Sequence, residues 1–129
     1  MLGAFGAHAL KEVISPEMLL VFETGVRYQF LHSIAIILVA AMLRYIDEQV
    51  ARIAFTLFLI GIILFCGSIY LLATRQILLG NAIQWIGFIT PLGGLSFIGG
   101  WFILAVRGYQ IPDGIQRSHR RKSNSEMEE

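Results

Sequence analysis

Four ionisable side chains near the ends of apolar segments are the residues best suited to chemistry: His8, Glu23, Arg27 and His32. Histidine titrates near neutral pH and binds metals, and an ionisable group at membrane depth points to a functional site. Glu23 and Arg27 are four residues apart with the acid first, which favours an ion pair on one helix face. One interpretation is therefore an outward-facing polar cluster of these four residues.

A simpler interpretation places both histidines at the membrane interface, hydrogen-bonded to backbone or lipid headgroups. Two histidines without a cysteine or a paired carboxylate motif make a poor metal signature. The sequence also has no Ser-His-Asp order and no nucleophile elbow. We therefore predict a non-enzymatic protein with no catalytic residues, no cofactor and no metal site.

The composition indicates a membrane protein. Of the 129 residues, 56% are hydrophobic and 15% are charged, whereas soluble proteins have about 25% charged residues. The charges gather in short zones between long apolar segments, as expected where hydrocarbon cannot solvate charge. The net charge of +1 gives no bulk attraction to nucleic acid. We predict the lipid bilayer as a partner and no nucleic acid.

Three apolar segments are long enough to cross a bilayer, which takes about 20 helical residues. We predict spans at about 28–45, 53–73 and 83–106, in an all-α, polytopic transmembrane helical bundle. Trp85 and Trp101 lie toward the two ends of the last span, where aromatic residues anchor helices at the membrane interface.

The segments next to these spans carry local signals. Ser15 is a good N-cap and Pro16 suits a first helical position, so a helix is expected to start at Pro16. We predict that 16–27 is an interfacial lead-in and that the charged residues of 44–52 form a loop. Thr90-Pro91 is expected to interrupt the hydrogen-bond ladder of the third span.

The distribution of Lys and Arg predicts the orientation. Three spans place the 44–52 loop and the C-terminal tail on the same face of the membrane. This face carries seven basic residues: Arg44, Arg52, Arg107, Arg117, Arg120, Arg121 and Lys122. The opposite face carries three: Lys11, Arg27 and Arg75. The richer face is cytoplasmic by the positive-inside rule. We predict a multi-pass protein of the cell membrane, with a membrane domain at 1–107 and a disordered cytoplasmic tail at 108–129.

Small residues repeat at helical spacing along the third span: Thr90, Gly93, Gly94, Ser96 and Gly100. Small faces allow helices to approach closely in lipid. This helix-packing face fits either internal bundle packing or a homo-oligomer interface.

Four motifs in order carry a family resemblance: GAFGAHALK (3–11), SPEMLLVFETGVRYQFLHSIAIILV (15–39), FCGSIYLLA (65–73) and ITPLGGLSFIGGW (89–101). Together they resemble the bacterial family catalogued as domain of unknown function 423, which is distantly similar to the eukaryotic transmembrane protein 256 family. The resemblance covers roughly residues 1–107. It implies a membrane location and four helices in a full-length member, the first ending in GAFGAHAL, so 1–10 is expected to be the remnant of a first helix. It implies no activity.

The leading functional hypothesis is a structural or accessory membrane component, with a homo-oligomer or a membrane complex as its partner. The alternative is a small-solute transporter or channel protomer acting as an oligomer. A break at Pro91, flanked by Thr90, Gly93 and Gly94, would expose backbone groups to a cavity in that case.

Overall fold

The computed structural model describes residue 10 and residues 12–78 and 84–108, and every regular element in them is a helix. The elements are α2 (Pro16–Ala41), α3 (Glu48–Gly61), the π-helix η2 (Ile62–Cys66), α4 (Gly67–Leu78), the 3-10 helix η4 (Gln84–Phe88) and α5 (Ile89–Arg107). Three helical stretches are long and apolar enough to cross a membrane: Pro16–Ala41, Glu48–Thr74 and Ile86–Arg107. The predicted all-α transmembrane bundle is confirmed.

Helix α2 begins where the local signals predict. The Ser15 hydroxyl accepts a hydrogen bond from the Met18 amide at 3.3 Å, and Pro16 occupies the first turn. The helix passes Gly25 without a break and ends at Ala41, earlier than the predicted 45. The backbone thus shows one continuous helix over the predicted lead-in and most of the first span, and the division at 27 stays a prediction about lipid depth.

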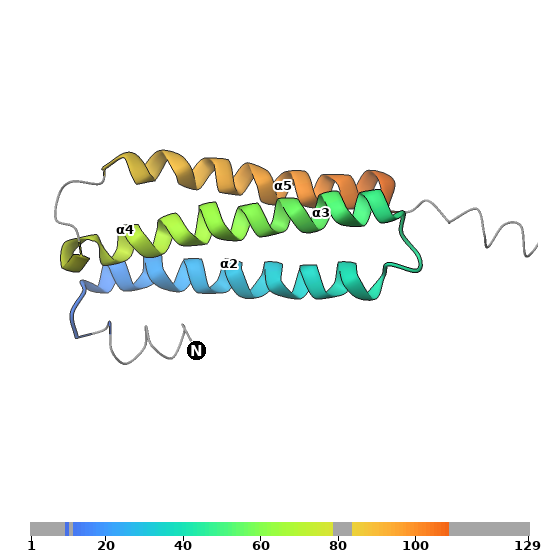
Figure 1. The fold of residues 1–129 in the computed structure, drawn as a ribbon. Coiled ribbons are helices and arrows are strands. Elements are labelled where there is room, and N and C mark those ends of the chain that lie inside the picture. The colour runs from blue at the N-terminus through green and yellow to red at the C-terminus, as the bar shows by residue number, and fades with distance from the viewer. Residues whose placement is uncertain (1–9, 11, 79–83, 109–129) are drawn as a thin grey trace, which may run out of the picture.

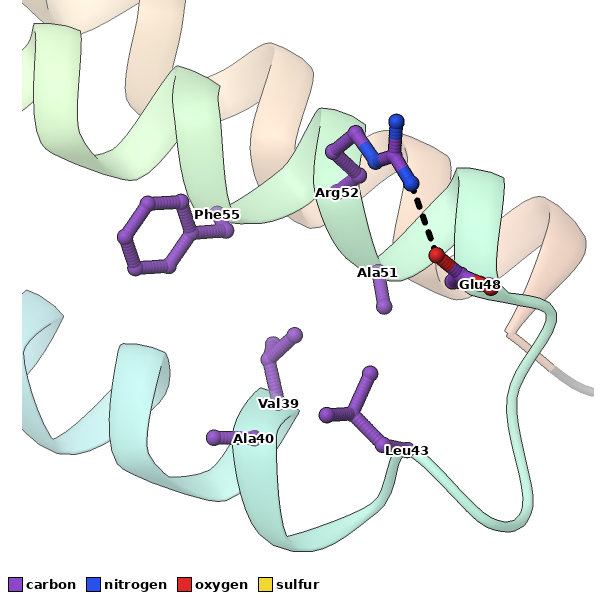
Figure 2. Close-up of a pocket in the computed structure, with 7 residues that line it drawn as sticks. All are labelled: Val39, Ala40, Leu43, Glu48, Ala51, Arg52 and Phe55. Atoms are coloured by element: carbon purple, nitrogen blue, oxygen red, sulfur yellow. Dashed lines mark hydrogen bonds and ion pairs between the residues drawn. The ribbon is translucent and has the colours of Figure 1, made fainter.

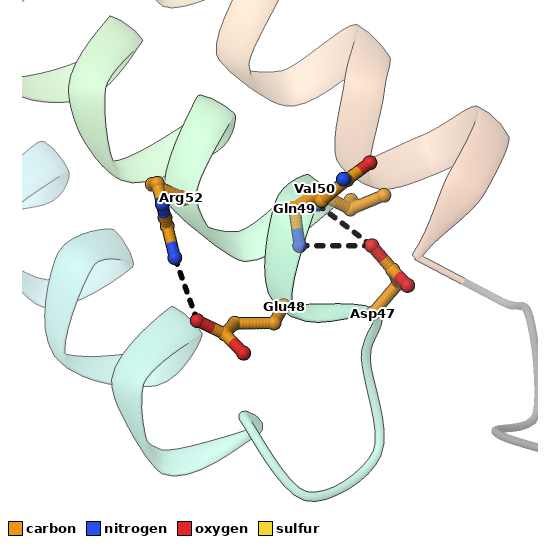
Figure 3. A network of polar contacts seen from close by, with 5 residues as sticks. All are labelled: Asp47, Glu48, Gln49, Val50 and Arg52. Carbon is orange, nitrogen blue, oxygen red and sulfur yellow. Dashed lines mark hydrogen bonds and ion pairs between the residues drawn. The ribbon is translucent and has the colours of Figure 1, made fainter.

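The predicted charged loop at 44–52 is wrong in its second half, because α3 already begins at Glu48. Asp47 caps this helix: its Oδ1 accepts hydrogen bonds from the amides of Gln49 at 2.8 Å and Val50 at 3.3 Å (Figure 3). Arg52 then pairs with Glu48 one turn away. An N-cap carboxylate satisfies amides that have no partner inside the helix, so the charged residues favour helix here.

The predicted interruption of the hydrogen-bond ladder at Thr90-Pro91 is wrong, because α5 runs without a break from Ile89 to Arg107. Pro91 is in the first turn of α5, directly after η4. A first-turn amide has no acceptor within its own helix, so proline removes no hydrogen bond from the α5 ladder. The chain changes from a 3-10 to an α-helix here and continues to Arg107.

The three membrane-length helices lie side by side, with α3 and α4 between α2 and α5 (Figure 1). Their shared core includes Ala35 and Val39 of α2, Phe58 of α3, Cys66 of η2 and Phe97 of α5. Only 17 to 28% of each spanning window is buried within the protein. The outer faces carry large apolar side chains, so a lipid bilayer is the environment that this bundle requires.

Candidate functional site

His32 is the only ionisable residue of the predicted polar cluster that lies inside the described bundle, where it is 6% exposed. Its ring stacks on Phe97 of α5, with centroids 3.5 Å apart and planes 15° apart. Phe58 of α3 is tilted against it at 5.5 Å. The Trp101 indole N–H donates a hydrogen bond to His32 Nε2 at 3.3 Å. One imidazole on α2 therefore contacts both other membrane helices.

The hydrogen-bond partners of the two ring nitrogens determine the tautomer of His32. Nδ1 lies 2.8 Å from the backbone carbonyl oxygen of Tyr28. A carbonyl can only accept, and the Trp101 N–H can only donate, so Nδ1 carries the proton and Nε2 accepts. The Nδ1 bond therefore lies within α2, and the Nε2 bond joins α2 to α5. No ring nitrogen is left for a metal or a substrate in this arrangement.

Glu23 and Arg27, two other members of the predicted cluster, do not join His32. Glu23 and Arg27 form an i,i+4 ion pair at 3.6 Å, and their side chains are 45% and 76% exposed. They lie on the surface of α2, whereas His32 faces the interior. His8 lies outside the described residues. A functional role for the four residues stays a prediction.

Two further polar pairs cross between helices, and sequence reasoning missed both. The Tyr70 hydroxyl donates to Gln29 Oε1 at 2.7 Å, which joins α4 to α2. The Ser68 and Thr90 hydroxyls are 2.8 Å apart and join α4 to α5. Their partners are 41 and 22 residues apart in the chain. A polar residue facing inward within a span was the available signal, but its partner could not be read from spacing.

The predicted packing face of α5 has an inner part and an outer part. A Cβ at Gly93 would collide with the backbone of Phe65 in η2, and one at Gly100 would lie 2.6 Å from the Phe58 ring. Both glycines are buried. The Ser96 hydroxyl donates a hydrogen bond to the Leu92 carbonyl of its own helix. A Cβ at Gly94 would lie 3.8 Å from the Phe65 ring, which is an ordinary van der Waals contact. Use of this face between copies of the chain stays a prediction.

Glycines on other helices contact aromatic rings in the same way. A Cβ at Gly25 of α2 would lie 2.8 Å from the Tyr70 ring, and one at Gly61 of α3 would lie 2.5 Å from the Phe97 ring. Each ring covers a position that has no side chain, which allows close approach of the two backbones. At Gly25, Gly61 and Gly100 a glycine on one helix thus packs against an aromatic ring of another.

An open groove of about 590 Å³ lies between α2 and α3, near the loop that joins them (Figure 2). Its walls are apolar side chains, and Glu48 and Arg52 lie at one end with an ion pair of 2.7 Å. Both charged side chains are well exposed, at 80% and 74%. At this groove a charged pair borders an apolar cavity.

The described residues contain no group of three or more His, Cys, Asp or Glu side chains placed to hold a metal. Every buried side-chain nitrogen or oxygen among them has a hydrogen-bond partner. Cys66 is buried in the same core cluster as Phe58 and Ala54. What this interior can do is hold three helices in register.

The comparisons with known proteins agree with a membrane bundle. The family model described as "Protein of unknown function (DUF423)" matches residues 2–94. A UPF0382 membrane protein of Haemophilus influenzae is 42% identical over 110 residues, covering 84% of this chain and 82% of the relative. The UPF0382 inner membrane protein YgdD of Escherichia coli is 39% identical over 85% of this chain and 79% of its own length. The UPF0382 membrane protein YwdK of Bacillus subtilis is 38% identical over 81% of each chain.

No solved structure matches the chain. The names of these relatives state a membrane location and no enzymatic or transport activity. The resemblance predicted from the four sequence motifs is confirmed, and the chain belongs to the DUF423 family of membrane proteins of unknown function.

Proposed function

We propose that this protein is a non-enzymatic structural or accessory component of the cell membrane, and that its apolar outer faces bind another copy or another membrane protein. The observation that carries the proposal is the use of the interior polar groups. The side chains of His32, Gln29 and Ser68 are each in a hydrogen bond with a side chain of a neighbouring helix. A site for chemistry would need polar groups free to meet a substrate.

The outer faces support the second half of the proposal. On α5, Leu95, Ile98 and Phe102 are 63 to 65% exposed. Their contacts in a membrane are lipid or another helix, and van der Waals packing drives helix association there.

The basic residues support a cytoplasmic C-terminus. Arg44 and Arg52 lie near the loop between α2 and α3, and Arg107 ends α5 at the same end of the bundle (Figure 1). Positive charge concentrates on the cytoplasmic side of membrane proteins. The proposed arrangement therefore has this end inside the cell.

Site-specific photo-crosslinking in native membranes tests the proposal. A photoreactive residue at Ile98, which is 65% exposed, is expected to capture a second copy or another membrane protein. The neighbouring Phe97, which is 4% exposed, is the matched control and is expected to crosslink only within the chain. Capture of lipid alone at Ile98 and at the exposed Phe30 and Ile63 on the other two spanning helices would contradict the proposal.

A transporter or channel protomer stays the alternative prediction. Its motivation was a helix break at Pro91, but Pro91 lies in the first turn of α5 and exposes no carbonyl within that helix. Flux into liposomes containing the purified protein is the test. Uptake of any small solute that empty liposomes exclude would favour this alternative over a structural role.

A further inference from the structure

The groove between α2 and α3 changes from charged to apolar along its length. It is lined by Val39, Ala40 and Leu43 of α2 and its following turn, and by Glu48, Ala51, Arg52 and Phe55 of α3 (Figure 2). Glu48 and Arg52 are in the first two turns of α3, at the start of a membrane-length stretch. Phe55 lies about 10 Å beyond Glu48 along the helix axis, at 1.5 Å per residue.

This order matches the order of chemical groups in a phospholipid. The beginning of a membrane-spanning helix lies at the headgroup level, and the following turns lie among acyl chains. A lipid beside α3 would therefore place its headgroup at Glu48 and Arg52 and the upper part of one chain against Phe55 and Ala40. A cavity of about 590 Å³ is large enough to accept such a segment.

The two charges indicate which headgroup fits. Glu48 offers a carboxylate that accepts hydrogen bonds, and Arg52 offers a guanidinium suited to phosphate. Their mutual ion pair is exposed and therefore stabilises the fold little, so both groups can exchange partners at small cost. Asp47 does not compete, because its carboxylate caps α3 (Figure 3).

A headgroup with one phosphate and one primary ammonium satisfies both residues. A choline headgroup has no N–H to donate to Glu48, and an anionic glycerol headgroup brings no cation to it. We propose that this groove is a binding site for a phospholipid with a primary ammonium headgroup, phosphatidylethanolamine, whose phosphate binds Arg52 and whose ammonium binds Glu48. This inference goes beyond the proposed function and does not depend on it.

Native mass spectrometry of the full chain in a non-ionic detergent tests the site. The protein is titrated with phosphatidylethanolamine, phosphatidylcholine or phosphatidylglycerol of identical acyl chains. We expect the ethanolamine lipid to bind about fivefold more tightly than either other lipid, a ratio at the upper end of what one exposed ion pair provides. Glu48→Gln is expected to remove the preference over the choline lipid, and Arg52→Gln to weaken all three.

A pair of neighbouring alanines tests the position of the site. Ala40 lines the groove, whereas Ala41 is exposed and lies outside its lining. Ala40→Phe is expected to abolish the preference and Ala41→Phe to preserve it, with circular dichroism confirming that both variants fold. Equal binding of the three lipids by the unmodified chain would overturn the proposal. So would an unchanged preference in Ala40→Phe, or a second copy of the chain occupying the groove in place of lipid.

Discussion

Replacing Gly93 by alanine tests the closest helix contact in the bundle. A Cβ at Gly93 would lie 2.7 Å from Cα and Cβ of Phe65 and closer still to its amide nitrogen. An ordinary contact needs at least 3.4 Å, so α5 and η2 must separate by about 0.7 Å or more. The amide nitrogen and Cα of Phe65 belong to backbone, which cannot move aside as a flexible side chain would.

The expected loss of stability follows from two opposing effects. Overpacking of a well-packed site costs about 1 to 3 kcal/mol, and a backbone obstruction places Gly93→Ala at about 3. Alanine regains about 1 kcal/mol of helix propensity relative to glycine. The net destabilisation is therefore about 2 kcal/mol.

Gly94→Ala is the matched control for this variant. A Cβ at Gly94 would lie 3.8 Å from the Phe65 ring, an ordinary van der Waals contact. Both variants gain the same helix propensity, so the difference between them, about 3 kcal/mol, measures overpacking alone.

Unfolding by SDS in mixed micelles, followed by circular dichroism, compares the two variants. Gly93→Ala is expected to unfold at a lower SDS fraction than the unmodified chain, and Gly94→Ala at an equal or higher fraction. Equal midpoints for the two variants would refute the close contact between α5 and η2.

Four further predictions use the same detergent system or the same chain. His32→Phe removes the acceptor for the Trp101 N–H and is expected to cost about 0.6 kcal/mol and at most about 1.7 kcal/mol, the average and the maximum for hydrogen bonds between membrane helices. Adding Trp101→Phe is expected to restore part of this loss, and strictly additive effects in the double-mutant cycle would contradict the bond. Gly100→Ala, whose Cβ would lie 2.6 Å from the Phe58 ring, is expected to destabilise the bundle more than Gly99→Ala, whose Cβ would lie 3.5 Å from Leu57. Cys66, the sole cysteine, is expected to react with a maleimide much more slowly in mild detergent than in SDS, because its side chain is 1% exposed; equal rates would show that the core is open. A C-terminal fusion is expected to be fluorescent with green fluorescent protein and inactive with alkaline phosphatase, and the reverse pattern would contradict the proposed orientation.

The membrane character and the helices were predictable because they depend on local composition. The apolar segments at 53–73 and 83–106 contain no charged residue, and any long helix of that kind requires lipid. The Ser15 cap and the Pro16 start were also readable, since capping acts over three or four residues.

Helix bounds next to charged residues were harder to predict. Asp47, Glu48 and Arg52 were interpreted as a loop because charge is unfavourable in hydrocarbon. The same residues form a capped helical turn with an i,i+4 ion pair. An N-cap Asp followed by Glu and Arg at helical spacing was the signal that could have placed the start of α3 correctly.

Contacts between helices depended on geometry that no local pattern contains. His32 was identified as a candidate from its residue type, but its partners Phe97 and Trp101 follow from how α2 faces α5. The π-helix Ile62–Cys66 likewise had no signal within its own apolar sequence.

This π-helix has a consequence for how one transmembrane segment serves two partners. A turn closed between residues five apart takes up one more residue than an α-turn, so every side chain after it is rotated by about 100° around the axis. Before this shift, Phe58 is directed at Gly100 of α5; after it, Tyr70 is directed at Gly25 of α2. A single extra residue thus lets the middle segment pack mainly against α5 with its first half and mainly against α2 with its second.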